Sequence, residues 1–347
     1  MDATAASSHA LAADPQAHLR FWPEGVPRAV DAVPATLWQV YAARATTEPG
    51  AVGLRFLGRE WTWRRLVAES EALAGALQVR GVAKGDRVLL FMQNCPQFVI
   101  AFHAVLACGA VVVPVNPMNK ADELPHYIAD AGARVAIAST DIAGELARAS
   151  DALPAGQGLA HLMVFDLADA LPGFGVEPEA LAELPEGWRA WLPVRHAAPA
   201  MASGRVESWA HWIAEARAPM PVAVDRADLA LLPYTSGTTG LPKGCLHTHG
   251  TLSQNAAASG PWHDVRPGDV QLIVVPMFHI TGLVMGLLAS VRHGASIVLL
   301  PRWDRDVAAR AIAAHGVTHW HNIPTMVIDL LGTPDLDRYD LSTLRYI

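Results

Sequence analysis

The stretch Tyr234-Thr235-Ser236-Gly237-Thr238-Thr239-Gly240-Leu241-Pro242-Lys243-Gly244 decides how the rest of the chain is interpreted. From Thr235 to Gly240 every residue is Gly, Thr or Ser, which leaves backbone N–H groups uncovered and places hydroxyls on one short loop. Glycine has an unrestricted φ angle, so successive N–H groups can curl around an anion. The hydroxyls and the charge of Lys243 add hydrogen bonds, each worth about 1.5–3 kcal/mol when charge-assisted. The sequence therefore predicts a phosphate-binding loop, and we call residues 235–243 the phosphate loop.

Spacing excludes a Walker-type loop. That motif needs four residues between its first glycine and Gly-Lys, with Ser or Thr after the lysine. Counting from Gly237, the second glycine would fall on Pro242, and Lys243 is followed by Gly244. Residues 229–234 and 245–248 have strand character, so we expect the loop to join two strands rather than to open a helix. A solvated Gly/Thr turn is the plain structural alternative.

With an aromatic residue before Thr-Ser-Gly-Thr-Thr-Gly-Leu-Pro-Lys-Gly, the loop resembles the signature of the adenylate-forming enzymes, which include acyl-CoA synthetases, firefly luciferase and nonribosomal-peptide adenylation domains. Residues 21–28 (FWPEGVPR) and 115–117 (VNP) are most similar to bacterial fatty-acyl-CoA ligases. The resemblance implies that a fatty acid reacts with ATP to give an acyl-adenylate and pyrophosphate, and that CoA then displaces AMP. It also implies Mg²⁺, whose ligand would lie in a segment after Ile347.

The resemblance assigns roles to particular residues. Lys243 and Thr239 are expected to be catalytic, because they would hold the β- and γ-phosphates as pyrophosphate leaves. An aliphatic carboxylic acid would lie beside His279 and the apolar helix after it. Some long-chain relatives carry a gating tryptophan where this chain has Leu283. The residues expected to bind ATP are Thr235, Ser236, Gly237, Thr238, Thr239, Gly240 and Lys243, and those expected to bind the acid are His279, Thr281, Leu283, Pro324 and Thr325. A structural role for His279, and a plain helix start at Pro324, remain open.

Helix patterns from Trp63 to about Val79 and from Pro96 to Ala107, the second with Asn94 as its cap, alternate with strand patterns. This alternation predicts an α/β fold with two lobes, each a mostly parallel sheet covered by helices. We expect an N-terminal arm and first helix in residues 1–50. The first lobe would occupy residues 51–224, with an irregular, Trp-rich crossing segment at 151–221. The second lobe, 225–347, would carry the phosphate loop. Because the resemblance places a small mobile lid with a catalytic lysine after Ile347, we expect a truncated N-terminal part that is inactive alone.

Composition excludes several other classes of protein. The 347 residues carry a net charge of −7 and no Lys/Arg-rich run, which argues against nucleic acid as a partner. The three cysteines form no Cys-x-x-Cys pair, so neither a disulfide framework nor a thiolate metal site is expected. Residues 104–115 are apolar but too short to span a bilayer, which takes about 20 residues. We therefore expect a cytoplasmic protein, with peripheral contact at the inner membrane face and the oligomeric state left open.

The sequence also allows other functions for the loop and other roles for its histidine and tryptophan residues. A non-catalytic nucleotide- or acyl-binding remnant, and an adenylation domain that loads a carrier protein, share the same loop. Hydrolase and dinucleotide readings lack their GxSxG and GxGxxG motifs. Two histidine pairs, His247 with His249 and His319 with His321, are expected to share strand faces and to pack rather than to bind metal. Packing is also expected, ahead of a pocket-lining role, for Trp188, Trp191, Trp209 and Trp212.

Overall fold

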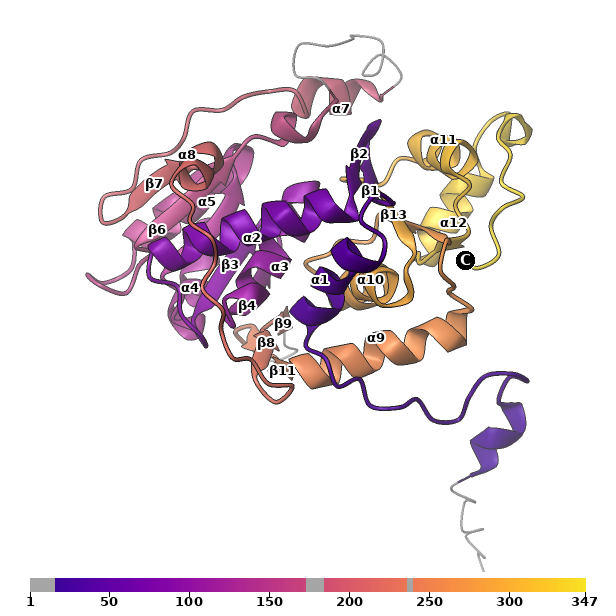
Figure 1. Cartoon of the computed structure of the whole chain (residues 1–347). Helices are drawn as coiled ribbons and strands as arrows, with labels where there is room; N and C mark the ends of the chain where they lie inside the picture. The colour runs from indigo at the N-terminus through magenta and orange to yellow at the C-terminus, as the bar shows by residue number, and fades with distance from the viewer. Residues whose placement is uncertain (1–15, 173–183, 236–239) are drawn as a thin grey trace, which may run out of the picture.

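The computed structural model describes residues 16–172, 184–235 and 240–347, and these residues form two main sheets with helices packed around them (Figure 1). The first sheet has seven strands in the order β11-β8-β4-β3-β5-β6-β7, and the second has five in the order β14-β12-β13-β1-β2. Neighbouring strands run parallel except in the β8–β11 and β1–β2 pairs. The α/β fold with mostly parallel, helix-covered sheets is therefore confirmed.

The central strands of the seven-stranded sheet are buried on both faces. Along β3, Val88 and Leu90 belong to one core cluster, which includes residues of α2 and α3, whereas Leu89 and Phe91 belong to another, with residues of α4 and α5. This alternation follows from the two-residue period of a strand between two layers of helices. The strands are β3 (Arg87–Phe91), β4 (Val111–Val115), β5 (Val135–Ser139), β6 (His161–Phe165), β7 (Arg205–Ser208), β8 (Leu229–Leu231) and β11 (His247–Thr248), and the helices around them are α2 (Trp63–Val79), α3 (Pro96–Ala107), α4 (Leu124–Ala131), α5 (Thr140–Asp151), η2 (Leu167–Ala170), α7 (Glu186–Trp191) and α8 (Trp209–Ala214).

The five-stranded sheet lies beside a layer of packed helices. Helix α9 leaves the end of β11 and runs along α1 and α10 toward the second sheet (Figure 1). A side-chain and backbone capping box between Thr36 and Gln39 begins α1. The strands are β1 (Val52–Phe56), β2 (Arg59–Thr62), β12 (Val270–Ile273), β13 (Ser296–Leu299) and β14 (His319–Trp320), and the helices are η1 (Ala17–Phe21), α1 (Leu37–Thr47), α9 (His249–His263), η3 (Thr281–Leu288), α10 (Ala289–His293), α11 (Arg305–His315), α12 (Pro324–Leu331) and η4 (Leu336–Arg338).

Sheet membership does not follow the expected boundaries at residues 50/51 and 224/225. The hairpin β1–β2 precedes the strands of the first sheet in the chain, yet β1 pairs with β13 of the second sheet. Conversely, β8 and β11 follow residue 224 but belong to the first sheet, where β8 pairs with β4. The expected irregular segment 151–221 contributes β6 and β7 to that sheet as well. Apolar periodicity identifies a strand but not its partner, which tertiary packing selects.

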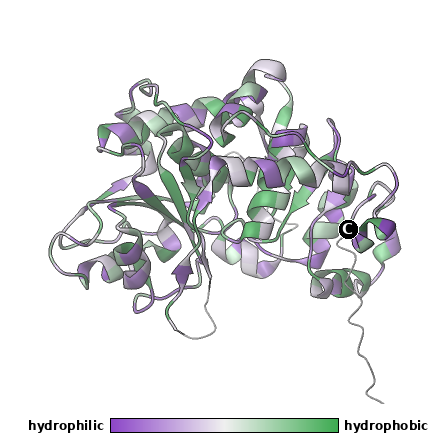
Figure 2. Ribbon diagram, turned by 90° about the horizontal axis from the view of Figure 1, so that it is seen from below, coloured by the Kyte–Doolittle hydropathy of each residue, from purple (hydrophilic) through white to green (hydrophobic). Residues whose placement is uncertain are grey.

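Hydrophobic residues follow the strands and the central helices, whereas hydrophilic residues are more frequent on the outer helices and loops (Figure 2). Among the described residues, no helix combines the length and the apolar character that crossing a membrane requires.

A buried polar cluster links α1, α2 and α3. The imidazole ring of His103 stacks on the phenol ring of Tyr41 at a centroid distance of 3.5 Å. Its Nδ1–H donates to the Val99 carbonyl at 2.8 Å, while Nε2 has no partner among the described residues. The Tyr41 hydroxyl in turn lies 3.3 Å from the Ser70 hydroxyl. Burial lowers the pKa of His103 to about 3, so this side chain is neutral in the folded protein.

Acidification is expected to destabilise the protein through His103. Its ordinary pKa is 6.5, so below that pH the unfolded chain binds a proton that the folded chain excludes. The contribution of His103 to the free energy of unfolding is therefore fully present above pH 6.5. Below that pH it falls by about 1.4 kcal/mol per pH unit, a loss of about 2 kcal/mol at pH 5. The variant His103→Phe keeps an aromatic ring beside Tyr41 but cannot titrate. Urea unfolding at neutral pH and at about pH 5 should show a smaller acid-induced loss for the variant, and an equal loss in both proteins would contradict the assignment.

Candidate active site

The two ends of the phosphate loop form a short antiparallel hairpin. Strand β9 (Tyr234–Thr235) pairs with β10 (Lys243–Gly244), and Lys243 lies directly opposite Thr235. Residues opposite one another on neighbouring strands point to the same face, so the ammonium and hydroxyl groups share one side of the hairpin. Both residues are exposed, as is Gly240, and Lys243 forms no ion pair with the described residues. The expected strand–loop–strand arrangement is therefore confirmed.

The remaining loop residues, Ser236, Gly237, Thr238 and Thr239, lie outside the described residues. In the chain, the hairpin lies between β8 and β11 of the seven-stranded sheet. Just before it, Leu232 N–H donates to the Val112 carbonyl at 2.8 Å, and Cys245 N–H extends the pairing of the two hairpin arms by donating to the Pro233 carbonyl at 2.8 Å. The loop thus begins just after the carboxyl end of β8, which runs parallel to β4. In open α/β sheets, ligands bind outside the carboxyl ends of the strands.

His249 is not on the strand where the sequence placed it. Strand β11 ends at Thr248, which caps α9 through reciprocal bonds with Thr251, so His249 is the first helical residue. It is fully buried, and its Nδ1 accepts a hydrogen bond from Leu37 N–H at 3.3 Å. Burial lowers the pKa of His249 to about 4. The strand face that His247 and His249 were expected to share therefore does not form, because the strand ends at Thr248 and the capping box begins the helix at His249.

His279 occupies the exposed turn between β12 and the helix after it. Its Nδ1 accepts a hydrogen bond from Thr281 N–H at 3.3 Å, so Nε2 carries the proton of the neutral ring. The helix from Thr281 to Leu288 is a π-helix, and α-helical geometry begins only at Ala289. Gly282 fits because a Cβ there would lie 2.4 Å from the Pro276 carbonyl oxygen. π-helical turns occur frequently at functional sites, and apolar periodicity alone does not distinguish them from an α-helix.

The expected acid-binding residues differ in accessibility. Leu283 is 1% exposed and packs in the main core cluster, whereas Thr281 is half-buried. Pro324 is the first residue of α12, and both it and Thr325 are exposed. Because β12 and β14 are adjacent and parallel, the turn at His279 and the start of α12 follow the same edge of the five-stranded sheet.

Asn94 joins the carboxyl ends of the two sheets, although its position before Pro96 suggested a helix cap. The N-cap of α3 is Cys95 instead. The buried Asn94 side-chain amide donates to the carbonyls of Val275 and Leu300, each at 3.3 Å, and its Oδ1 accepts from Met277 N–H at 2.8 Å. Asn94 follows β3, and its partners follow β12 and β13. The carboxyl edge that carries the phosphate loop therefore meets the edge that carries His279.

His319 and His321 share the expected face and converge on the end of α9. His321 Nε2 lies 3.2 Å from His263 Nδ1, and His319 Nε2–H donates to the His263 carbonyl at 2.9 Å. Burial lowers the pKa of His321 to about 4, and that of His263 is lowered for the same reason. The ring of Tyr346 lies 4.6 Å from that of His263. The group is consistent with the expected packing role.

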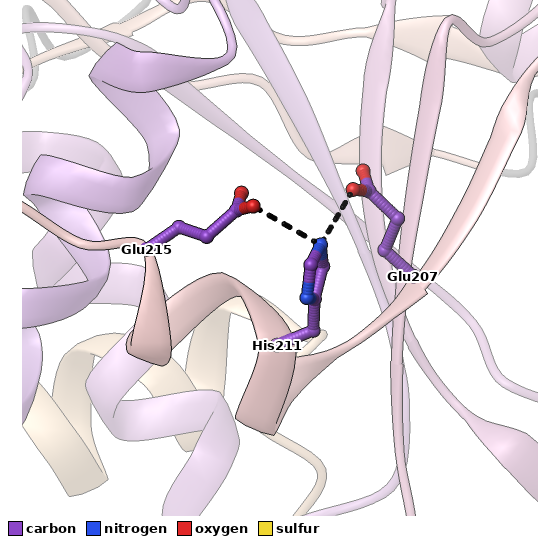
Figure 3. A group of neighbouring side chains, drawn as sticks. All are labelled: Glu207, His211 and Glu215. Atoms are coloured by element: carbon purple, nitrogen blue, oxygen red, sulfur yellow. Dashed lines mark ion pairs between the residues drawn. The ribbon is translucent and has the colours of Figure 1, made fainter.

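A separate group of potential metal ligands lies at the outer edge of the seven-stranded sheet. Figure 3 shows the imidazole of His211 pointing between the carboxylates of Glu207 and Glu215, at 3.4 and 3.5 Å respectively. Arg80 already pairs with both carboxylates, at 3.4 Å and 2.8 Å. The arrangement is thus an ion-pair network, and it lies at the opposite edge of the sheet from β8 and β11.

Two of the cavities formed by the described residues are lined by residues other than those expected to bind ATP or the acid. One, of about 610 Å³, lies between β13 and α11, and the other, of about 530 Å³, lies between α2, α3 and α8. Trp209 lines the second cavity, whereas Trp188 and Trp212 are buried. The packing role expected for the tryptophans therefore holds for these two, and Trp209 has the pocket-lining role.

Comparison with known proteins decides the family. The family described as AMP-binding enzyme matches residues 41–347. The chain belongs to this family. This AMP-binding enzyme is 29% identical over 329 residues to the long-chain-fatty-acid–CoA ligase of Bacillus subtilis, covering 93% of this chain and 56% of the relative. It is 31% identical over 311 residues to 4-coumarate–CoA ligase 2 of Oryza sativa subsp. japonica, covering 88% and 50%.

A solved structure supports the same fold. The inhibitor-bound N-terminal domain of FACL13 from Mycobacterium tuberculosis superposes with a TM-score of 0.71 at 24% identity, covering 90% of this AMP-binding enzyme and 68% of that chain. The resemblance inferred from the phosphate loop is therefore confirmed, and so is the fold of an acyl-CoA synthetase N-terminal domain. The chain spans about half the length of the two curated relatives.

Proposed function

We propose that this AMP-binding enzyme is part of an ATP-dependent carboxylate–CoA ligase that acts on a fatty acid. In the first half-reaction, the carboxylate would attack the α-phosphorus of ATP to give an acyl-adenylate, with pyrophosphate as the leaving group. In the second, the CoA thiol would attack the acyl carbon to give the thioester, with AMP leaving. One arrangement carries the proposal. The exposed Lys243, which forms no ion pair with the described residues, stands opposite Thr235 at the carboxyl edge of one sheet, and Asn94 joins that edge to the strand ends beside His279.

The proposed role of Lys243 and the loop hydroxyls is to hold the β- and γ-phosphates while negative charge builds up on the departing pyrophosphate. Fixed donors aimed at such charge lower the barrier because they need no reorganisation during the reaction. Phosphate-loop residues 235–243 include no carboxylate, so by themselves they do not fit Mg²⁺, which prefers carboxylate oxygens. No step is therefore assigned to the metal ion.

The choice of a fatty acid rests on the apolar helix after His279 and on the first relative described above, which is named for long-chain fatty acids. That helix is apolar along its length, and its residues Val284, Leu287 and Leu288 pack in the main core cluster. Each methylene that an acid buries against apolar side chains contributes about 0.8 kcal/mol. The rice relative is named for an aromatic acid, 4-coumarate. Aromatic acids are therefore the competing substrate class. Cytoplasmic localisation is part of the same proposal.

The test is ATP–pyrophosphate exchange with a panel of fatty and aromatic acids. It should be run on the 347-residue chain and on a form extended with the C-terminal part of a family member. We expect exchange in the extended form, with fatty acids preferred. Preference for 4-coumarate would replace the substrate class while keeping the reaction, whereas nucleotide binding without exchange in either form would indicate a non-catalytic remnant and overturn the proposal.

A further inference from the structure

Helix α4 contacts both strands of the phosphate-loop hairpin. Its apolar residues Leu124 and Ile128 are buried in the core cluster on one face of the seven-stranded sheet. Two of its polar residues, His126 and Asp130, contact the hairpin instead. His126 Nε2–H donates to the Pro242 carbonyl at 2.6 Å, and Pro242 immediately precedes Lys243 in the chain.

The second contact reaches the other strand. The Tyr234 hydroxyl donates to Asp130 Oδ2 at 2.6 Å, and the Tyr127 and Tyr234 rings pack edge-to-face at a centroid distance of 4.8 Å. Partial burial, together with the hydrogen bond to Asp130, raises the pKa of Tyr234, so the hydroxyl remains a donor at neutral pH. One helix therefore holds β9 through Tyr234 and β10 through the peptide group next to Lys243.

The hairpin needs such support. Among the described residues, two of each strand pair, Tyr234 with Gly244 and Thr235 with Lys243, and a two-stranded hairpin is at best marginally stable in water. The side chains of Thr235 and Lys243 are exposed, so core packing does not fix them. A catalytic donor set must be held to within about half an ångström of its working position. The contacts of α4 supply that constraint on the protein side.

We propose that His126 is a positioning residue for the phosphate loop: through the Pro242 carbonyl it holds Lys243 where the leaving pyrophosphate is received. The inference rests on the proposed function, because it assigns the same anion to the loop. It adds a residue outside the loop motif, on a helix more than 100 residues earlier in the chain. A purely structural role for His126 would affect global stability, whereas a positioning role affects the order of the hairpin and the affinity for the anion.

The experiment compares His126→Ala, His126→Gln and Ala129→Gly with the parent chain. The glutamine amide can donate to the Pro242 carbonyl as the imidazole does. Ala129 is an exposed residue of α4 whose methyl side chain can form no hydrogen bond with the hairpin, so Ala129→Gly weakens the helix itself and is the matched control. Three quantities are measured: hydrogen exchange of amides 234–244, the Kd for magnesium pyrophosphate, and the thermal unfolding temperature.

We expect His126→Ala to accelerate hairpin exchange and to raise the pyrophosphate Kd by about tenfold, because anion binding would then have to order the hairpin that this hydrogen bond holds in place. The glutamine variant should recover most of both losses. Ala129→Gly should lower the unfolding temperature at least as much as His126→Ala does, without changing exchange in the hairpin. Lys243→Ala serves as the reference for the loop itself.

The outcomes separate the two proposals. If Lys243→Ala weakens pyrophosphate binding while His126→Ala changes neither the Kd nor hairpin exchange, the positioning role is overturned and the loop assignment stands. If the parent chain does not bind pyrophosphate, or binds it as well without Lys243, the loop assignment fails, and hairpin exchange alone then decides whether His126 orders the segment. Failure of glutamine to restore either quantity would also contradict positioning through the hydrogen bond.

Discussion

Replacing Lys243 by alanine is expected to lower ATP–pyrophosphate exchange in the extended form by about 100-fold or more, the usual cost of removing a donor aimed at transition-state charge. Lys243 is exposed and forms no ion pair with the described residues. Its removal should therefore change the free energy of unfolding by less than about 0.5 kcal/mol. The pair of measurements, exchange rate and urea unfolding, separates lost chemistry from lost folding.

Lys120→Ala is the matched control for this substitution. Lys120 is also exposed, and its ammonium lies 3.9 Å from Glu145. The rate of ATP–pyrophosphate exchange should be unchanged in this control. Thr239→Val, in the part of the loop outside the described residues, should lower the exchange rate as Lys243→Ala does. A Lys243→Ala protein that exchanges at the parental rate would rule out the proposed role of the loop.

Asn94→Ala is expected to lower the free energy of unfolding by about 3 kcal/mol. The side chain is 4% exposed and satisfies the backbone groups of Val275, Leu300 and Met277. Alanine would leave these buried groups without their partner, and each unsatisfied group costs about 1–3 kcal/mol. Urea unfolding of the 347-residue chain measures the loss, which is a large share of the roughly 5–15 kcal/mol of a typical domain.

Asn116→Ala provides the comparison for Asn94→Ala. Asn116 is also an asparagine that follows a strand, but its side chain accepts one local hydrogen bond, from Met118 N–H at 3.0 Å. Its loss should cost about 1 kcal/mol or less. Equal destabilisation by the two variants would mean that the hydrogen bonds of Asn94 between the sheets contribute nothing beyond an ordinary turn contact.

Much of the local structure is predictable because it depends on neighbours in sequence. The spacing of apolar residues from Trp63 to Val79, and Pro96 at the start of a helix, predicted α2 and α3 with the bounds observed. The sequence around the phosphate loop similarly predicts a loop between two strands, and the pairing of β9 with β10 agrees with that expectation. In each case the signal lies within a short window, where steric preference and periodicity act directly.

The site's remaining features depend on residues that are distant in sequence. Asn94 looks like a helix cap until Val275 and Leu300 are placed beside it. No sequence pattern marks His126, because its partner is a backbone carbonyl, which every residue possesses. His249 differs from its expected strand position for a local reason, because the capping box between Thr248 and Thr251 begins α9 at His249. The polar contacts that bring the site together are thus the part that a single sequence leaves undetermined.

The mixed membership of the two sheets affects how the chain folds as it leaves the ribosome. All seven strands of the first sheet are complete by Thr248, whereas β1 must wait for β13, since Leu54 pairs with Ile297. Pairing between strands so distant in sequence is slow, because the entropy of loop closure is lost before the stabilising contacts form. Until β13 is synthesised, the unpaired edge of the early hairpin stays open to other strands. The strands nearest the N-terminus are therefore among the last to reach their final place.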